Sequence, residues 1–198
     1  MTILSDSTIS DYAYHNGMIY PFIGHQVKTD STNPSKRLLS YGLSSAGYDV
    51  RLTEDVKIFT NVNTNIIDPK KFDDKCLVSA TIHDSEDGKY FVIPPNSYAL
   101  GVTVEYFNLP RNVMAVVLGK STLARCGISI NCTMIEPGFM GHVVIEIANT
   151  THLPTKIYIG EGIAQFVFHE LDRACVLSYA DRGGKYMHQT NGITLAKV

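Results

Sequence analysis

The sequence contains no tryptophan, only four cysteines in 198 residues, and no marked excess of either charge. Its 17 Lys and Arg residues nearly balance its 19 Asp and Glu residues, which gives a net charge of −2 at pH 7. No basic run is longer than the pair Lys70–Lys71. Proteins that follow the phosphates of a nucleic-acid duplex need a clustered basic surface. We therefore expect no nucleic-acid partner.

Long apolar runs are also missing. Met114–Leu118 is typical of the longest apolar stretches, whereas a helix that spans a bilayer needs about 20 such residues. The segment Met1–Asp6 has neither the basic part nor the apolar part of a secretory signal. These absences predict a protein without a membrane partner and with a cytoplasmic location.

The cysteines and histidines do not form a zinc-binding motif. The cysteines are Cys76, Cys126, Cys132 and Cys175, with no C-x-x-C pair among them. Zinc deaminases and zinc hydrolases carry His-x-Glu with Pro-Cys-x-x-Cys, or His-Glu-x-x-His, and neither pattern is present. We interpret the cysteines as reduced structural residues, because a chain of this length needs no disulfides to hold a core. We expect no protein-bound metal.

The length and composition indicate one folded domain over residues 1–198. Hydrophobic residues make up 44% and charged residues 18% of the chain, a mixture that excludes disorder throughout. Near the N-terminus, Ser5–Thr8 offers residues that cap a helix, Ile9, Tyr12 and Ala13 have helical spacing, and Asn16–Gly17 supplies a C-cap. This pattern predicts one short N-terminal helix.

From residue 48 onward, short apolar runs alternate with polar residues and are separated by turns. The predicted strands are 48–52, 56–58, 98–107, 113–118, 127–132, 142–148, 156–159 and 163–168, the last two joined by a turn at 160–162. The charged stretch 68–89 is predicted to be a surface excursion, and the polar tail 178–198 a mobile C-terminal arm. The pattern favours an all-β barrel or sandwich.

Glu146 lies inside the apolar run Val143–Ile147. Since side chains alternate along a strand, Glu146 shares one face with His142 and Val144. That face can be an ordinary solvent-exposed face. Alternatively, Glu146 is partly desolvated, which raises the pKa of its carboxyl and suits it to proton transfer near neutral pH. The spacing leaves both interpretations open.

The segment Gly119–Arg125 places two cations and two hydroxyls directly after an apolar run. It contains Gly-Lys-Ser, but a Walker A loop would need glycine at Met114, so we exclude a P-loop. An anion-binding site and a capped turn with solvated charges explain the segment equally well.

Several stretches spread over nearly the whole chain carry a family resemblance, and 68–89 matches least. These stretches are Ser40–Arg51, Ile93–Ser97, Glu105–Phe107, Gly119–Gly127, Glu136–Phe139, Gly141–Glu146, Asn149–Thr151, Leu153–Pro154, Gly162–Gln165, Ser178–Tyr186 and Gln189. Together they resemble the bacterial dCTP deaminases of the dUTPase superfamily.

The resemblance implies a distorted jelly-roll, dUTPase-like β-barrel that forms a homotrimer with active sites shared between subunits. It also implies hydrolytic deamination of Mg²⁺-bound dCTP to dUTP and ammonia without zinc, which supplies dUTP for dUMP and dTTP synthesis. Inhibition by dTTP is left open.

The resemblance implies roles for individual residues. Glu146 matches the general base and acid, Ser121 a residue that helps place the attacking water, and Arg125 an arginine beside the reacting base. The implied substrate contacts are Lys120, Ser121, Thr122, Leu123, Ala124, Arg125, Val144, Ile145, Glu146, Gln165, Tyr179, Lys185 and Gln189. Of these, Lys120, Ser121 and Thr122 match the segment that contacts phosphate, and Val144 and Ile145 a main-chain stretch that reads the base.

Two alternatives remain at this level. The stretch Ser45–Asp49 resembles a dUTPase motif, so a bifunctional enzyme that converts dCTP to dUMP is one of them. The other is a trimeric protein that binds the nucleotide without catalysis. The presence of Glu146, Ser121 and Arg125 together argues against the second alternative.

Overall fold

A computed structural model describes residues 2–131 and 133–198. Strands dominate this part of the chain, which confirms the predicted all-β class. The helical elements are α1 (Asp6–Asn16), α2 (Ser121–Arg125) and a 3-10 turn, η1 (Asp74–Cys76). The strands are β1 (Thr2–Ile3), β2 (Ile19–Tyr20), β3 (Gln26–Thr29), β4 (Arg37–Ser44), β5 (Gly47–Phe59), β6 (Leu77–Ser79), β7 (Tyr90–Ile93), β8 (Tyr98–Asn108), β9 (Val113–Gly119), β10 (Ile128–Ile130), β11 (Met140–Asn149), β12 (Thr155–Tyr158) and β13 (Gly162–Glu170).

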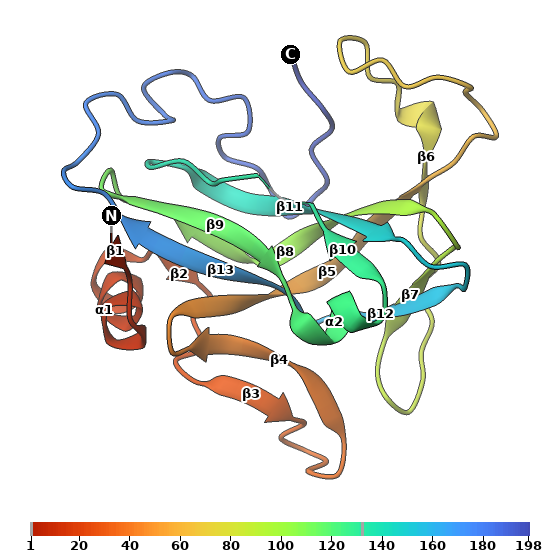
Figure 1. Ribbon diagram of the computed structural model, residues 1–198, viewed down its shortest axis with the longest axis horizontal. Coiled ribbons are helices and arrows are strands. Elements are labelled where there is room, and N and C mark those ends of the chain that lie inside the picture. The colour runs from red at the N-terminus through yellow and green to blue at the C-terminus, as the bar shows by residue number, and fades with distance from the viewer. Residues whose placement is uncertain (1, 132) are drawn as a thin grey trace.

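Most of the strands form one strongly curled antiparallel sheet (Figure 1). Its central path runs β1-β13-β5-β8-β11-β10, while β7 and β12 form a separate two-stranded sheet. The long strand β5 pairs with β13 through residues 48–51 and with β8 through residues 52–58. The register between β5 and β8 shifts between Leu52 and Val56. Since a bulge bends a strand and increases its twist, β5 carries the sheet around the curve.

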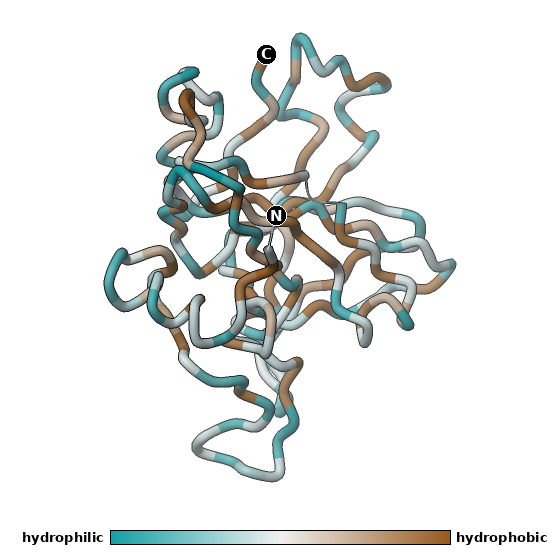
Figure 2. Tube along the Cα trace, turned by 60° about the vertical axis from the view of Figure 1, so that its left-hand side comes forward, coloured by the Kyte–Doolittle hydropathy of each residue, from teal (hydrophilic) through white to brown (hydrophobic). Residues whose placement is uncertain are grey.

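The core fills the inside of this curve. The largest fully buried side chains include Tyr48, Phe91, Phe107, Phe166 and Phe168. The rings of Phe107 and Phe166 stack with their centroids 4.8 Å apart. Figure 2 shows hydrophobic residues along the central strands and mostly hydrophilic residues in the peripheral loops. Each buried aromatic side chain of this kind contributes about 1.5–3 kcal/mol relative to an exposed one.

Most local predictions are confirmed. Helix α1 begins after Ser5, whose hydroxyl accepts a hydrogen bond from Thr8 N, and ends at Gly17 with a φ of 63°. The turn at 160–162 joins β12 to β13, but these two strands do not pair with each other. Instead, β12 pairs with β7, and β13 pairs with β5 and β9. None of the helices in the described part of the chain is long and apolar enough to cross a membrane.

The stretch 68–89 differs from the predicted surface excursion. It contains β6, which pairs with the end of β5, and it buries Cys76 and Leu77. The prediction missed β6 because the neighbouring charges dominate its composition. The interpretation of the cysteines as structural holds for Cys76, whereas Cys126 is exposed. Both are free thiols, and Cys132 lies outside the described residues.

A buried ion pair ties β5 to β8. Arg51 Nε donates to Glu105 Oε1 at 2.8 Å, and Arg51 N donates to Glu105 Oε2 at 2.9 Å. The Glu105 side chain is fully buried, and the Arg51 side chain is 16% exposed. Burial raises the pKa of the Glu105 carboxyl, and the hydrogen bonds and charge of Arg51 oppose that rise. The carboxylate therefore depends on Arg51 for its compensation.

We expect Glu105→Ala to lower the free energy of unfolding by about 3 kcal/mol, because it leaves the Arg51 guanidinium without its buried partner. Urea unfolding at one protein concentration measures this change. The matched control is Glu54→Ala, which breaks the exposed pair between Glu54 and Lys89 and costs about 0–1 kcal/mol. Equal stability of the two variants would contradict the prediction.

Candidate functional site

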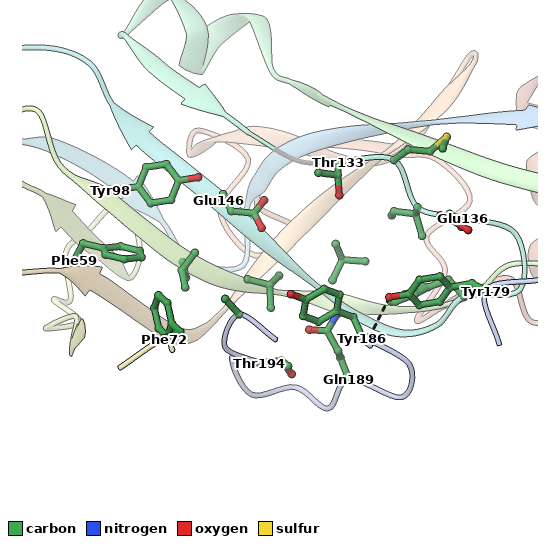
Figure 3. A pocket seen from close by; sticks show the side chains of 17 residues that line it. Phe59, Phe72, Tyr98, Thr133, Glu136, Glu146, Tyr179, Tyr186, Gln189 and Thr194 are labelled. Atoms are coloured by element: carbon green, nitrogen blue, oxygen red, sulfur yellow. Dashed lines mark hydrogen bonds between the residues drawn. The ribbon is translucent and has the colours of Figure 1, made fainter. Parts of the chain in front are cut away.

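A cavity of about 670 Å³ lies between β11 and the C-terminal arm (Figure 3). Residues from β5, the loop after β5, β8, β11, the loop after β10 and the arm line it. They are Phe59, Phe72, Tyr98, Leu100, Thr133, Met134, Ile135, Glu136, Phe139, Val143, Val144, Glu146, Tyr179, Tyr186, Gln189, Thr194 and Ala196. Its volume lies in the usual range for a small-molecule pocket.

Glu146 is half-buried and lies on the cavity face of β11. The alternation along β11 buries Val143, Ile145 and Ile147 in the core and leaves Val144 and Glu146 on the other face. On one side, the β11 backbone pairs with β8, where Glu146 lies opposite Leu100. On the other side, its carbonyl accepts a hydrogen bond from Asn131 N at 2.9 Å. The main chain that carries the carboxylate is therefore held from both sides.

An aromatic cluster forms one end of the cavity. The Phe59 ring contacts Tyr98 edge-on, with centroids 5.5 Å apart, and Phe72 edge-on, with centroids 6.3 Å apart. These three residues come from β5, the loop after it and β8, and sequence reasoning did not single them out. Their separation along the chain left no local motif to find. Aromatic walls near the Glu146 carboxylate suit a planar ring ligand that carries polar edges.

The C-terminal arm is docked over β11. Gln189 forms a parallel bridge with Gly141, and its carbonyl accepts a hydrogen bond from His142 N at 2.9 Å. A Cβ on Gly141 would lie 2.8 Å from Gln189 N, so this approach needs glycine. Tyr186 N donates to the Tyr179 hydroxyl at 3.1 Å, the dashed line in Figure 3. The predicted arm residues Tyr179 and Gln189 thus reach the cavity, and the mobility of the arm stays a prediction.

The Gln189 amide provides an acceptor at this site. Its Oε1 is buried and has no hydrogen-bond partner among the described residues. A buried acceptor without a partner is costly unless a ligand or water donates to it. The cavity thus combines a carboxylate, aromatic walls and an available amide oxygen.

The predicted residues on α2 lie elsewhere. None of Lys120–Arg125 is among the described residues that line the cavity. Leu123 is buried in the core, whereas Ser121, Thr122, Ala124 and Arg125 are exposed. The structure therefore divides the predicted residues into a cavity group and an α2 group.

Three other predicted residues have distinct positions. Gln165 lies opposite Asp49 in the β13–β5 ladder and donates from Nε2 to Ser44 Oγ at 3.1 Å. Ile145 is fully buried in the core, so its main chain alone can contact a ligand. Lys185 is exposed on the arm.

The described residues include no group of three or more His, Cys, Asp or Glu side chains arranged to hold a metal ion. The donor set of the cavity itself consists of Glu136, Glu146 and neutral side chains. Glu136 Oε2 accepts from Arg182 Nη2 at 2.6 Å, so an arginine of the arm already engages it. The expectation that no zinc takes part stays a prediction.

Comparisons with known proteins identify the family. The model of the dCTP deaminase-like family matches residues 3–171. The chain belongs to the dCTP deaminase-like family. The dCTP deaminase of Azotobacter vinelandii is 52% identical over 198 residues, and that of Acinetobacter baumannii (strain AYE) 50%, each match covering 100% of both chains. This family assignment confirms the resemblance found in the sequence.

A solved structure shows the same fold. The 2′-deoxycytidine 5′-triphosphate deaminase from Agrobacterium tumefaciens superposes with a TM-score of 0.55 at 18% identity. The match covers 85% of the present chain and 47% of the solved chain. The present chain therefore spans about half the length of the solved protein. The all-β fold of this chain is therefore also the fold of a dCTP deaminase of solved structure.

The arm begins with a turn that depends on a charged side chain. Asp181 Oδ2 accepts hydrogen bonds from Ser178 N at 2.9 Å and Ser178 Oγ at 3.0 Å, and Arg111 Nη2 lies 2.6 Å from the same oxygen. The hydrogen bonds from Ser178, followed by the charge of Arg111, hold the pKa of Asp181 below its ordinary value of 3.8. Because the folded pKa is the lower one, this stabilisation is present above the unfolded pKa and is lost as the pH falls through the folded pKa.

We expect amide hydrogen exchange in residues 178–186 to accelerate, relative to β13, as the pH falls below the ordinary Asp181 value. Mass spectrometry, with rates corrected for intrinsic exchange, measures this ratio. In the Asp181→Asn variant, the amides of residues 178–186 should exchange fast already at neutral pH, because the variant lacks the negative charge that attracts Arg111. Asp172→Asn, which alters a carboxylate of an exposed neighbouring pair, should leave the ratio unchanged. A ratio that is independent of pH in the wild-type protein would refute this account of the turn.

Proposed function

We propose that this protein is an enzyme that hydrolyses dCTP to dUTP and ammonia in the cytoplasm. The position of Glu146 carries the proposal, because a strand fixed by the core presents this carboxylate to an aromatic-walled cavity beneath the arm. The full-length relatives named dCTP deaminase support the choice of substrate.

Glu146 serves as both base and acid in this mechanism. It takes a proton from a water molecule, whose oxygen then forms a bond to C4 of cytosine. It passes this proton to the ring nitrogen, then takes the remaining proton from the new hydroxyl on C4 and passes it to the amine; the C4–N bond breaks, and ammonia leaves as C4 becomes a carbonyl. General acid–base catalysis of this kind contributes about 10²–10⁴-fold, so positioning of the water and the base must supply much of the remainder.

The active site is shared between the subunits of a homotrimer. The position of α2 supports this arrangement, since Ser121 and Arg125 are exposed outside the cavity of their own chain. In the trimer, α2 of one subunit meets the cavity of its neighbour. Ser121 then helps place the water, and Arg125 lies beside the reacting base.

The substrate enters as dCTP with Mg²⁺ on its triphosphate. Tyr179, Lys185 and Gln189 on the arm contact the nucleotide as the arm closes over it. The buried Gln189 Oε1 supports this role, because it lacks a donor among the described residues. Whether dTTP competes for the same site is an additional question that binding measurements answer.

The decisive assay incubates the purified protein with dCTP and Mg²⁺, with and without a zinc-selective chelator. It resolves dUTP, dUMP and ammonia over time. Chelator-resistant dUTP with equimolar ammonia is the expected result. Formation of dUMP and pyrophosphate would replace the proposal with the bifunctional activity, and binding of dCTP without products would leave a nucleotide-binding protein.

We expect Glu146→Gln to abolish turnover but to retain dCTP binding, because the amide keeps the size of the side chain and cannot accept the proton from water. Ammonia release measures turnover, and isothermal titration calorimetry measures the dissociation constant. Glu54→Gln, an exposed carboxylate on β5, serves as the matched control with normal turnover. Retained activity in Glu146→Gln would overturn the assignment.

Mixed trimers test the sharing of sites. Neither Glu146→Gln nor Arg125→Ala alone should turn over dCTP at an appreciable rate. We assume that each site joins Glu146 of one subunit to α2 of the next. In a random 1:1 mixture, about a quarter of the sites then combine the intact Glu146 of an Arg125→Ala subunit with the intact α2 of a Glu146→Gln subunit. We therefore expect co-refolded mixtures to regain about a quarter of the wild-type kcat. A mixture as inactive as its parents would show that both groups act within one chain.

A further inference from the structure

The last residues of the arm, 192–198, form part of the cavity wall, and we call them the terminal segment. Thr194 and Ala196 line the cavity, and Figure 3 shows Thr194 on the side that the arm covers. Ile193 and Leu195, which alternate with them, pack instead on a small apolar cluster of η1, β6 and β8. The terminal segment thus turns one set of side chains to the cavity and the other to the sheet.

A carboxylate on β5 fixes the start of the terminal segment. Asp55 Oδ2 accepts a hydrogen bond from Ile193 N at 2.8 Å. Asp55 lies in the bulge of β5, where the register with β8 shifts between Leu52 and Val56, and its own N–H donates to Thr53 Oγ1 at 3.3 Å. A bulge changes the direction of the side chains that it contains. The strand can therefore bury Leu52 and Val56 in the core and still present Asp55 to the arm.

The other end of the terminal segment returns to the arm. Lys197 N donates to the Tyr186 hydroxyl at 3.2 Å, and Lys197 Nζ donates to Lys185 O at 3.4 Å. Tyr186 lines the cavity, and Lys185 is one of the proposed nucleotide contacts. The terminal segment therefore connects the bulge of β5 to the part of the arm that the nucleotide is proposed to meet.

The position of the terminal segment depends on contacts with the rest of the protein. Residues 193–198, all of which the structure describes, belong to no helix or strand. A segment of this kind, with few buried apolar contacts, opens locally at low cost in free energy. The hydrogen bond to Asp55 and the packing of Ile193 and Leu195 hold it against the sheet. Loss of one of these contacts therefore lowers the fraction of molecules in which the arm is docked.

We propose that Asp55 is a positioning residue, which acts through the terminal segment to hold the arm in the docked position that the nucleotide needs. This inference rests on the proposed function, because it takes Tyr179, Lys185 and Gln189 as nucleotide contacts. Asp55 is not among the described residues that line the cavity. Its effect passes through the backbone of Ile193 and needs an acceptor oxygen at residue 55.

The steady-state constants of full-length Asp55→Ala test this role. If the arm is docked in only about a tenth of the molecules, the apparent affinity for the nucleotide falls about tenfold. Loss of a hydrogen bond to a charged acceptor is large enough for such a shift. We therefore expect Asp55→Ala to raise KM for dCTP about tenfold and to leave kcat within about threefold, because Glu146 and α2 stay in place.

Two matched variants separate the hydrogen bond from a general effect on β5. Asp55→Asn keeps an oxygen that can accept from Ile193 N, so it should recover most of the affinity. Glu54→Ala changes the neighbouring residue, whose exposed carboxylate pairs with Lys89, and should leave both constants unchanged. A wild-type KM in Asp55→Ala would overturn the inference. A lower KM would also overturn it, because the terminal segment would then obstruct the cavity.

Leu195→Ala tests whether the effect passes through the terminal segment. This variant leaves Asp55 intact but removes packing between the terminal segment and the apolar cluster. It should raise KM for dCTP and leave kcat unchanged, as in Asp55→Ala. Val198→Ala, at an exposed position near the chain end, should have no effect on either constant. A wild-type KM in Leu195→Ala would contradict the proposed route from Asp55 to the arm.

Amide hydrogen exchange of residues 192–198 tests the contact without any assay of catalysis. At short exchange times, Asp55→Ala should exchange faster than wild type in this segment and equally in β8, whereas Glu54→Ala should match wild type in both. Unchanged exchange in Asp55→Ala would overturn the inference even if dCTP proves to be a substrate. Conversely, a wild-type protein that releases no ammonia refutes the proposed function, while the exchange result still decides whether Asp55 holds the terminal segment.

Discussion

The alternation of side chains along β11 is the constraint on which both the fold and the site depend. One face of this strand supplies Val143, Ile145 and Ile147 to the core, and the other carries Glu146 into the cavity. A shift of one residue in the register would exchange the two sets. The same apolar contacts that stabilise the curled sheet therefore orient the carboxylate, and no separate contact is needed to set the direction of its side chain.

Local signals in the sequence were sufficient for α1 and for several strands of the sheet, and insufficient for the site. The capped helix α1 and the alternation of β11 depend on neighbouring residues, so they could be predicted. The aromatic end of the cavity depends on Phe59, Phe72 and Tyr98, which are brought together by the curl of the sheet. The short strand β6 was missed because its pairing with β5 outweighs its charged surroundings.

Contacts between residues far apart in the sequence also explain why the sequence left two interpretations open, one for Glu146 and one for Gly119–Arg125. Alternation shows that Glu146 is on the face opposite the core, but the arm that covers this face joins β11 more than 40 residues later along the chain. The segment Gly119–Arg125 shows two cations, but the partner of Lys120 lies on β5. A sequence displays charges and not their partners, so a lysine that faces inward has the same pattern as one that faces a phosphate.

The proposed division of the site between subunits gives the charge pair buried beneath α2 a structural purpose. Buried pairs seldom add to stability, because desolvation offsets their attraction. They do restrict geometry, since breaking them leaves a charge without compensation. If one subunit supplies Glu146 and the next supplies Ser121 and Arg125, errors in the position of either half add at the reacting atoms. Each half then needs its own support: the core packs beneath β11, and α2 contacts the rest of the subunit through Leu123 in the core and through Lys120, which contacts Asp49 on β5.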